Sequence, residues 1–353
     1  MRKRVGPRRK SRIEREGGGL ALSETWRAWV AENALRDVSR DDLRATLEAH
    51  GVPRVVADRE IDFVLGSPLF VGARRVANRA KRYELLTRLC RETARLGPAG
   101  GTITRRSSLS WEEFLDRYYA TGIPVVLTDT FDTWPLLAHW SPASLKARAG
   151  DADVEVVTGR DGDPACDAHH AKLSRTMRFG DLCDRITVAG STNDFYMIAN
   201  NLATQRPAIS ALLEDVRAPH PLLDEWRDGE CAFLWVGPAG TVTPLHHDTS
   251  NVLICQVFGR KRIRLYRRFE VALTDELHDA VYSPIDAEHP DFEAFPAYAA
   301  MDPIEVDLSP GEALFVPIGC FHHVRALEPS INLTFTGFRA PNRFIWYFPG
   351  GLR

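Results

Sequence analysis

Hydrophobic residues recur at helical spacing in the first quarter of the chain. In SETWRAWVAENAL the side chains of Trp26, Trp29 and Val30 fall on one face of a helix. Ser39, followed three residues later by a carboxylate, is a start signal for a second helix, DDLRATLEAHG. Two further amphipathic segments, DREIDFVLG and AKRYELLTRLCRETARLG, follow. The pattern predicts an α-helical bundle over residues 20–96.

The pattern changes after a glycine-rich segment, which predicts a linker at 97–106. Short apolar and β-branched runs follow, bounded by Gly, Pro, Asp and Asn, and each is typical of a strand. The runs are PVVLTD, VEVVTG, FYMIAN, AFLWVG, NVLICQVFG, KRIRLY and EALFVP. Many short strands in one region favour an antiparallel barrel or a double-sheet jelly roll. The sequence therefore predicts a mainly β domain over residues 107–353.

Charge is unevenly distributed along the chain. The first sixteen residues, MRKRVGPRRKSRIERE, carry eight Arg or Lys against two Glu, whereas the whole chain has a formal net charge of −2. A basic segment of this kind predicts a disordered, solvated tail over residues 1–19. Contact of this tail with nucleic acid, a ribosome or an acidic protein surface is the alternative.

Composition excludes several other classes of protein. The 44% hydrophobic and 26% charged residues are ordinary for a globular protein. No apolar run approaches the ~18–20 residues that cross a membrane, and the first residues carry no apolar signal segment. The six cysteines are scattered without a CxxC pair, so neither a disulfide framework nor a cysteine zinc site is indicated. We expect reduced thiols and a cytoplasmic protein.

Histidine and aspartate concentrate in TPLHHDTSN at 243–251, directly after a run with strand character. On a strand, His246 and Asp248 project from the same face, because alternate residues share a face. A third ligand is expected from PGEALFVPIGCFHHV, where a buried strand leads to His322 and His323. Two imidazoles and one carboxylate form the facial triad of non-haem Fe(II) oxygenases. Zinc held by the same ligands is the alternative.

A similar-looking cluster occurs in DPACDAHH, which contains Asp167, His169 and His170. This segment is rich in Gly, Asp and Pro and has no apolar strand to hold ligands rigid. We interpret it as a surface loop.

Strand alternation also singles out a lysine in GRKRIRLY. Lys261, Ile263 and Leu265 share one face of the predicted strand, and the two arginines between them share the other. Lys261 is therefore expected to point into the barrel, where burying an ammonium costs several kcal/mol unless an anion meets it. A bound dicarboxylate would provide that anion. The alternative is that Lys261 reaches out to solvent at the start of the strand.

TPLHHDTSNVLICQVFGRKRIRLY and PGEALFVPIGCFHHV resemble motifs of the JmjC or cupin-like Fe(II)/2-oxoglutarate oxygenases. The closer similarity is to the group that contains the asparaginyl hydroxylase of hypoxia-inducible factor and its bacterial relatives. GIPVVLTDTFDTWP, HWSPASLKARAGD, FYMIANN and FLWVGPAGTVTPLHHD extend the similarity, which covers roughly residues 105–340. The resemblance implies a double-stranded β-helix of the jelly-roll (cupin) type, preceded here by the α-helical region.

The resemblance also implies the roles of individual residues. His246, Asp248 and His322 match the iron ligands, since the family places its ligand at the first histidine of the second pair. Lys261 matches the lysine that pairs with the distal carboxylate of 2-oxoglutarate.

Four more residues are expected to contact the co-substrate. Thr243 and Tyr196 match hydroxyl groups that bind the same carboxylate in the family. Asn251 stands one place earlier after the HxD motif than the asparagine of the hypoxia-factor enzyme, and Thr334 stands where that enzyme has a second asparagine. These two departures concern the inner contacts of the co-substrate.

The activity that the resemblance implies is a dioxygenase using Fe(II), O2 and 2-oxoglutarate, with succinate and CO2 as co-products. The expected reaction is hydroxylation of a protein or peptide side chain. N-methyl demethylation, with release of formaldehyde, is one alternative. A metal-binding cupin without turnover is another, although such a module would not need Lys261, Thr243 and Tyr196 around its metal.

The sequence also suggests where larger partners bind. The loops at 159–176 and 270–300 are expected to frame a substrate groove. The sequence ends with FIWYFPGGLR, so the C-terminal helices that dimerise the hypoxia-factor enzyme are not expected. The helical region 20–96 is then the expected contact in any homodimer.

Overall fold

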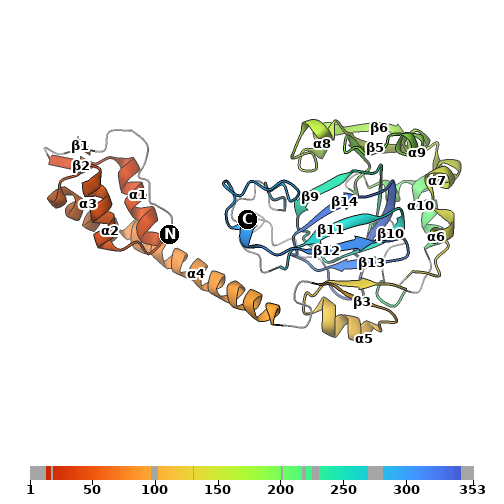
Figure 1. The fold of residues 1–353 in the computed structure, drawn as a ribbon, viewed down its shortest axis with the longest axis horizontal. Coiled ribbons are helices and arrows are strands. Elements are labelled where there is room, and N and C mark those ends of the chain that lie inside the picture. Colours follow the sequence, from red (N-terminus) through yellow and green to blue (C-terminus); the bar gives the residue numbers. More distant parts are fainter. Residues whose placement is uncertain are drawn as a thin grey trace. The chain divides into compact units, whose positions relative to one another are not determined.

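The computed structural model describes residues 13–16, 19–96, 102–129, 131–199, 202–216, 220–224, 230–268 and 281–342. The chain divides into two compact units, residues 1–88 and residues 89–353. Figure 1 shows helices in the first unit and two β-sheets with surrounding helices in the second.

The N-terminal unit is a small helical bundle. Its helices are α1 (Glu24–Leu35), α2 (Arg40–Ala49), α3 (Arg54–Gly66) and the first part of α4 (Pro68–Arg95). Trp26 and Val30 are buried in its core together with Leu43 and Ile61, so the apolar spacing predicted the inward face of α1 correctly. The hydroxyl of Ser39 accepts a hydrogen bond from the backbone N–H of Asp42, which caps α2 as its sequence predicted.

The structure differs from the sequence prediction at the start of this unit. Strand β1 (Ile13–Glu16) pairs antiparallel with β2 (Gly19–Leu22), so the predicted disorder of the tail does not extend to 13–16. The pairing joins Ile13 to Leu22, whose side chain is buried in the bundle core. Residues 1–12, which hold most of the basic charge, lie outside the described residues.

The second unit is a sandwich of two β-sheets. The larger sheet has the strand order β3-β4-β13-β10-β15-β8, and the smaller has β12-β11-β14-β9. The strands of the larger sheet are β3 (Thr104–Arg106), β4 (Val125–Leu127), β8 (Ala232–Gly237), β10 (Val252–Phe258), β13 (Ala313–Val316) and β15 (Ser330–Phe335). The strands of the smaller sheet are β9 (Val242–His246), β11 (Lys261–Leu265), β12 (Ile304–Leu308) and β14 (His322–Ala326).

Neighbouring strands are antiparallel, except that β3 pairs parallel with β4. This double-sheet architecture confirms the predicted fold class: a mainly β cupin-like core with an N-terminal helical region. Each of the seven runs predicted as strands contains a strand, although only Phe195–Tyr196 of FYMIAN forms β7.

The larger sheet is buried on both faces. On one face Leu253, Phe315 and Leu333 pack in a core that includes side chains of the surrounding helices, such as Phe114 and Phe179. The remaining short elements of this unit are α5 (Trp111–Phe114), α6 (Leu136–His139), α7 (Pro142–Ala149), α8 (His170–Leu173), α9 (Phe179–Val188), α10 (Pro207–Ser210), β5 (Asp153–Thr158) and β6 (Ser174–Arg178).

The other face of the larger sheet meets the smaller sheet. Val252, Ile254 and Leu314 of the larger sheet form one cluster with Ile263 and Val306 of the smaller sheet. This apolar cluster fills part of the interior of the sandwich, and the polar residues described below share the same interior.

The predicted linker, 97–106, is shorter in the structure. Thr104–Arg106 form strand β3, and Ile103 packs against the apolar cluster between the sheets. Residues 97–101 lie outside the described residues. The sequence prediction placed these few residues in the linker because a three-residue strand is too short to show alternation.

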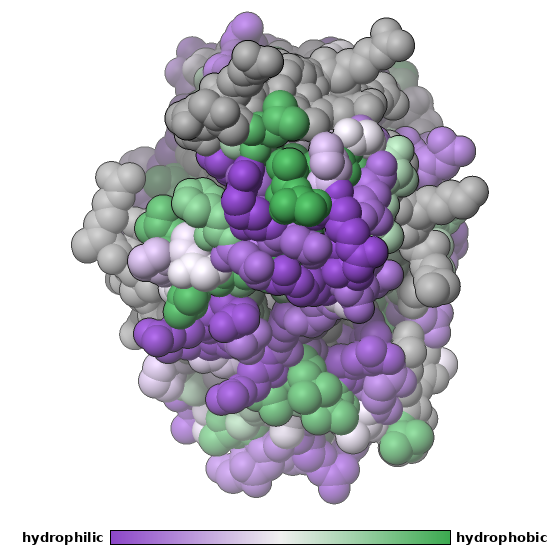
Figure 2. Space-filling model, turned by 90° about the vertical axis from the view of Figure 1, so that its left-hand side faces the viewer, coloured by the Kyte–Doolittle hydropathy of each residue, from purple (hydrophilic) through white to green (hydrophobic). Residues whose placement is uncertain are grey.

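Hydrophilic residues predominate in the face of the molecule that Figure 2 shows. In the face shown in Figure 2, apolar residues form small separate groups among hydrophilic ones. Phe63 belongs to the exposed residues, with 61% of its surface accessible, which the amphipathic pattern of its helix did not predict. Among the described helices, none combines the length and the apolar character needed to cross a membrane.

Candidate metal centre and co-substrate pocket

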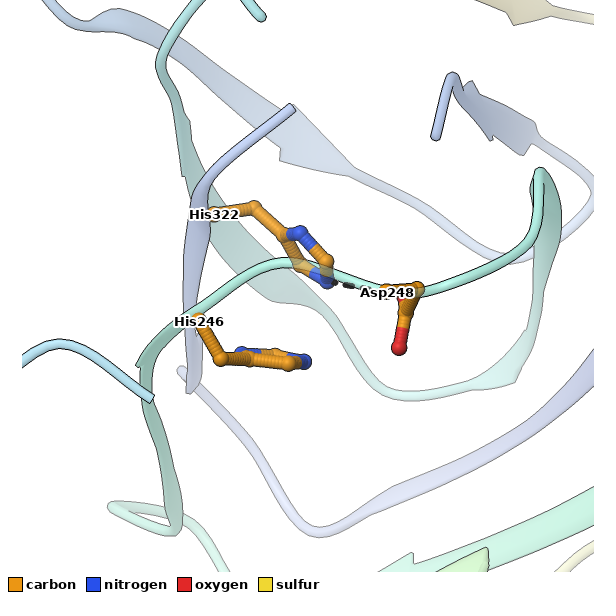
Figure 3. A group of neighbouring side chains, drawn as sticks. All are labelled: His246, Asp248 and His322. Carbon is orange, nitrogen blue, oxygen red and sulfur yellow. Dashed lines mark ion pairs between the residues drawn. The ribbon is translucent and has the colours of Figure 1, made fainter. Parts of the chain in front are cut away.

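Two neighbouring strands of the smaller sheet carry the predicted metal ligands. His246 is the last residue of β9 and His322 is the first residue of β14, and the two are paired across the ladder. Asp248 lies two residues beyond the end of β9. One ligand atom from each of these three side chains lies within 4.8 Å of the other two. Figure 3 shows the two imidazoles and the carboxylate converging on a common space.

Both imidazoles are oriented by the backbone. Nδ1 of His246 lies 2.8 Å from the carbonyl oxygen of Pro244, and Nδ1 of His322 lies 3.1 Å from that of Cys320. A carbonyl oxygen only accepts, so each Nδ1 carries the proton and donates it. Each Nε2 is then the unprotonated nitrogen, and that of His322 lies 3.6 Å from the Asp248 carboxylate. This is the arrangement by which proteins fix the tautomer of a metal-binding histidine.

The protonation state of the site suits a cation. Burial, followed by the neighbouring His246, lowers the pKa of His322 to about 4, so this imidazole is neutral near pH 7. Neutral imidazole and ionised carboxylate are the forms that bind metals. The donor set therefore fits a divalent transition metal, with two nitrogens and one oxygen and with room left for other ligands.

The two other histidines in these motifs point elsewhere. His323 is buried beside Glu288 in a second cavity of about 770 Å³, on the opposite face of β14. The ring of His247 packs edge-on against Phe321, with the ring centroids 4.8 Å apart. The structure thus brings His322, and not His323, together with His246 and Asp248.

Lys261 lies in the same interior, two strands away from β9. Strand β11 alternates between buried and accessible residues, with Lys261 buried and Arg262 exposed, as strand parity predicted. Its Nζ donates hydrogen bonds to the hydroxyl of Tyr196 at 2.8 Å and to Oδ1 of Asn332 at 2.5 Å. Burial lowers the pKa of Lys261 to about 7. Within the described part of the chain, no carboxylate forms an ion pair with this ammonium.

Tyr196 and Thr243 complete one side of this polar group. The Tyr196 hydroxyl is hydrogen-bonded to the Thr243 side chain, and burial raises the pKa of Tyr196 well above its usual value. The ring of Tyr196 packs directly against the backbone of Gly237. A Cβ at that position would lie 2.6 Å from the tyrosine ring, so Gly237 is what allows the ring to lie there.

Asn332 is a site residue that the sequence reasoning missed. It lies on β15 of the larger sheet and faces Lys261 across the interior, two residues before Thr334. Nδ2 of Asn332 lies 3.5 Å from the Thr334 hydroxyl, and both residues line the cavity. Because residues two apart share a strand face, the expectation for Thr334 was the signal that could have identified Asn332.

Asn251 has different surroundings. Its carboxamide Nδ2 donates to Oδ1 of Asn342 at 2.8 Å, and its Oδ1 accepts from the backbone N–H of Ile318 at 2.9 Å. Asn251 is not among the described residues that line the cavity. The side chain of Asn251 thus links the carboxamide of Asn342 to the backbone of Ile318.

The segment DPACDAHH, which the sequence indicated as a surface loop, contains one buried charged residue, Asp167. One carboxylate oxygen of Asp167 accepts from Nη1 of Arg160 at 2.5 Å, and only 2% of the residue is accessible. His169 and His170 belong to the accessible part of the segment, and His169 pairs with Asp163 at 2.7 Å. The sequence did not indicate the burial of Asp167, because nothing in it shows that Arg160 would be buried beside this carboxylate and neutralise it.

These groups surround one cavity of about 360 Å³ between the sheets. Its lining includes His246, Asp248, His322, Lys261, Tyr196, Thr243, Asn332, Thr334, Asp167, Trp235 and Tyr282. Small-molecule sites in proteins have volumes of this order and combine apolar walls with a few placed polar groups. The loop predicted at 270–300 contributes Tyr282, whereas residues 269–280 lie outside the described residues.

A sandwich of two β-sheets that encloses an HxD…H triad defines the cupin class of domain, in the form that carries a facial triad. The comparison with protein families agrees, because the family described as "Cupin-like domain" matches residues 111–338. The chain therefore belongs to the JmjC/cupin-like domain family.

Relatives of known name show the same relationship. Lysine-specific demethylase JMJ30 of Arabidopsis thaliana is 32% identical over 240 residues, which cover 66% of this chain and 54% of that protein. Lysine-specific demethylase 8 of Xenopus tropicalis is 33% identical over 234 residues, covering 64% and 50%. The chain thus spans about half the length of these curated relatives.

Among solved structures, E. coli ycfD is 23% identical and covers 67% of this chain and 55% of that chain, with a TM-score of 0.36.

Proposed function

We propose that this protein is an Fe(II)- and 2-oxoglutarate-dependent oxygenase that hydroxylates a side chain of a protein or peptide. The observation that carries the proposal is Lys261, a buried ammonium in the same cavity as the triad and without a carboxylate partner among the described residues. A buried charge of this kind is costly unless an anion completes it. A dicarboxylic acid that also reaches the metal site would meet both requirements.

The polar residues of the cavity would have different roles in this reaction. His246, Asp248 and His322 would hold the iron, and Lys261 with Tyr196 would receive the distal carboxylate of 2-oxoglutarate. Thr243 supports this hydrogen-bonded group through Tyr196. Asn332 keeps the ammonium oriented through its Oδ1. Bound iron, with 2-oxoglutarate and O2, supplies oxidation of a C–H bond and leaves succinate and CO2.

The protein would position the substrates in the cavity and exclude water from it. Val252 and Ile254 form part of the cavity wall, and Tyr282 stacks on His246 with the ring centroids 5.7 Å apart. These walls limit the approach of water to the triad. A metal-binding cupin without turnover would have no use for the Lys261–Tyr196 pair beside the triad, and this observation favours the enzyme.

Demethylation is the second candidate reaction, and it is favoured by the similarity to two proteins named as lysine-specific demethylases. Both reactions begin with oxidation of a C–H bond, so the same site supports either. If the oxidised carbon is an N-methyl group, the product loses that carbon as formaldehyde. If it is a carbon of the side chain itself, the hydroxyl group stays.

Asp167 supports a basic side chain as the substrate. Its Oδ1 is paired with Arg160, whereas its buried Oδ2 has no hydrogen-bond partner in the described structure. The residue lines the cavity that holds the triad. A buried carboxylate oxygen needs a donor, and the ammonium or guanidinium group of a substrate would supply one. This feature is compatible with both hydroxylation and demethylation.

The experiment is turnover of a peptide panel that contains lysine, methyl-lysine, arginine and neutral side chains. We expect succinate to form in proportion to a product heavier by one oxygen atom, on basic peptides and only with Fe(II) and 2-oxoglutarate present. Formaldehyde in proportion to succinate would instead assign demethylation. No oxidised product from any peptide, with the metal and co-substrate bound, would contradict a protein substrate.

The same panel tests Asp167. Asp167→Asn keeps an acceptor for Arg160 but removes the negative charge, and Asp163→Asn is the matched control in the same segment. A hydrogen bond to a charged group contributes about 1.5–3 kcal/mol, so the KM for the basic peptide should rise roughly ten- to a hundredfold. 2-Oxoglutarate affinity should not change. Equal KM values for the basic peptide in Asp167→Asn and Asp163→Asn would show that Asp167 does not bind the substrate.

A further inference from the structure

Helix α4 (Pro68–Arg95) exposes an unusual number of apolar side chains. The accessible fractions are 86% for Leu69, 70% for Val76 and 62% for Tyr83, and Cys90 is exposed as well. These four residues are spaced seven apart, so they form one column along the helix. An exposed apolar column of this regularity indicates a surface that another helix covers.

The column belongs to a longer heptad pattern. Ala73, Ala80 and Thr87 stand between its members, which gives alternate steps of four and three residues from Leu69 to Cys90. Every position in this seam is uncharged, although α4 is otherwise rich in arginine. At about 1.5 Å per residue, the seam is about 32 Å long. Uncharged residues in this 3,4 repeat are the pattern of a coiled coil.

A different face of α4 packs on the N-terminal bundle. Phe70 is buried in the core of that bundle, and the guanidinium of Arg74 lies 5.8 Å from the centre of its ring. Further along the same face, Nζ of Lys81 pairs with Asp37 at 2.6 Å. The bundle therefore does not cover the seam.

The charges that flank the seam select both the partner and its direction. In a parallel pair of α4 helices in register, position 79 of one helix lies beside position 84 of the other, because g and e positions five residues apart meet. Arg79 would then pair with the partner's Glu84, twice by symmetry. In an antiparallel pair Arg79 lies beside the partner's Leu86, and no opposite charges meet. Arg91 also occupies an e position and would lie beside the partner's Leu86, whereas the other basic residues of α4, Arg74, Arg75, Lys81, Arg82, Arg88 and Arg95, occupy positions away from the seam.

We propose that α4 forms a parallel coiled coil with α4 of a second copy of this chain. Leu69, Val76, Tyr83 and Cys90 lie at its centre, each facing the same residue of the partner. The small residues Ala73, Ala80 and Thr87 let the two helices approach. The dimer would present two oxygenase units, each with its own complete site.

Sedimentation of the full-length chain tests the seam. Tyr83→Glu places two carboxylates at the centre of the coiled coil, and the dimer dissociation constant should rise at least about a hundredfold. The matched control is Leu85→Glu, the same new charge on a neighbouring exposed leucine outside the seam, which should leave the dimer unchanged. Equal helix content by circular dichroism would show that both variants are folded.

Mild oxidation tests the direction. Of the six cysteines, Cys90 alone is exposed, and a parallel pair places it opposite the partner's Cys90. We expect a disulfide-linked dimer from the wild type and none from Cys90→Ser. Glu84→Arg should weaken the dimer about three- to tenfold, and adding Arg79→Glu should restore it.

Three results would overturn the proposal. A monomeric wild type would mean that no second copy binds, and protection of Cys90 from maleimide in that monomer would show that the chain covers its own seam. Dissociation by Leu85→Glu with an intact Tyr83→Glu dimer would place the interface on another face. A dimer that does not form the Cys90 disulfide would show that the helices are not parallel and in register.

Discussion

At the scale of single residues, the metal centre depends on how three side chains are held. His246 and His322 each donate from Nδ1 to a backbone carbonyl two residues earlier, of Pro244 and Cys320. The two hydrogen bonds direct Nε2 of both rings toward Asp248. The chain therefore fixes the tautomers without help from another side chain, and we expect the site to tolerate changes around it but not at the ligands.

The first prediction compares the adjacent histidines of β14. His322→Ala should abolish binding of Fe(II), because it removes one of three ligands. His323→Ala should retain the metal, because His323 faces the second cavity with Glu288. Titration with Fe(II) under anaerobic conditions measures both. Iron binding that survives in His322→Ala but fails in His323→Ala would reverse the assignment.

The second prediction concerns pH and Lys261. Burial lowers the pKa of its ammonium from the ordinary value of 10.5 to about 7, so the unliganded site loses the proton above about pH 7. A carboxylate binds the charged form, and binding above this pH must take up a proton. The affinity for 2-oxoglutarate should fall as pH rises from about 7 to 9, by up to about tenfold per unit.

Calorimetry in buffers of different ionisation enthalpy measures this proton uptake directly. Between about pH 7 and 10 the unfolded chain holds the lysine proton more tightly than the unliganded fold does. This group therefore makes the unliganded fold more stable as pH rises through that range. Binding that takes up no proton at pH 8 would show that Lys261 is already charged, or that it does not meet the ligand.

Strand alternation explains the residue positions that the sequence anticipated, and tertiary contacts explain the positions that it did not. The inward direction of Lys261 follows from alternation along β11, although Asp248 lies just beyond the strand on which parity was argued. The segment that holds Asp167 was interpreted as a surface loop, because the sequence does not show that Arg160 would be buried beside Asp167 and pair with it. Asn251 was expected at the co-substrate on family grounds, and its hydrogen bonds go elsewhere.

At the scale of elements, the site depends on the order of strands in the smaller sheet. Strands β11, β14 and β9 are neighbours, so Lys261 and His322 lie on adjacent strands and His246 lies on the next one. The strand runs were readable from the sequence because each is short, apolar and bounded by turn residues. The pairing of these strands could not be read from the sequence, because β9 and β14 are neighbours in the sheet but far apart in the chain.

The third prediction concerns the small element that the sequence assigned to the linker. A chain beginning at Ile103 keeps β3 and its pairing with β4, whereas a chain beginning at Ser107 lacks both. Three backbone pairings and the packing of Ile103 should contribute about 2–4 kcal/mol to the free energy of unfolding. Thermal unfolding of both chains measures the difference, and equal melting temperatures would show that β3 contributes nothing.

At the scale of the whole molecule, the chain divides into a unit that carries the metal triad and a helical unit whose described residues contribute no metal ligand. The triad, Lys261 and the cavity belong entirely to residues 89–353. The chain beginning at Ile103 should therefore bind iron and 2-oxoglutarate like the full chain. It lacks α4, so it should not dimerise. The periodicity of the sequence predicted the helical unit. The exposed seam of α4 could be identified only from the accessible fraction of each residue in the structure.

We propose that Lys261 holds a carboxylate of 2-oxoglutarate beside the metal, and calorimetric titration of the Fe(II)-loaded protein with 2-oxoglutarate measures this contact. Lys261→Ala and Lys261→Arg should both lose affinity, the second because a guanidinium is wider and differently shaped. The neighbouring Arg262→Ala is the matched control, since Arg262 points outward and pairs with Asp307. We predict a loss of about ten- to a hundredfold in both lysine variants, with unchanged iron binding and an unchanged control. Wild-type affinity for 2-oxoglutarate in Lys261→Ala would show that Lys261 does not hold the co-substrate.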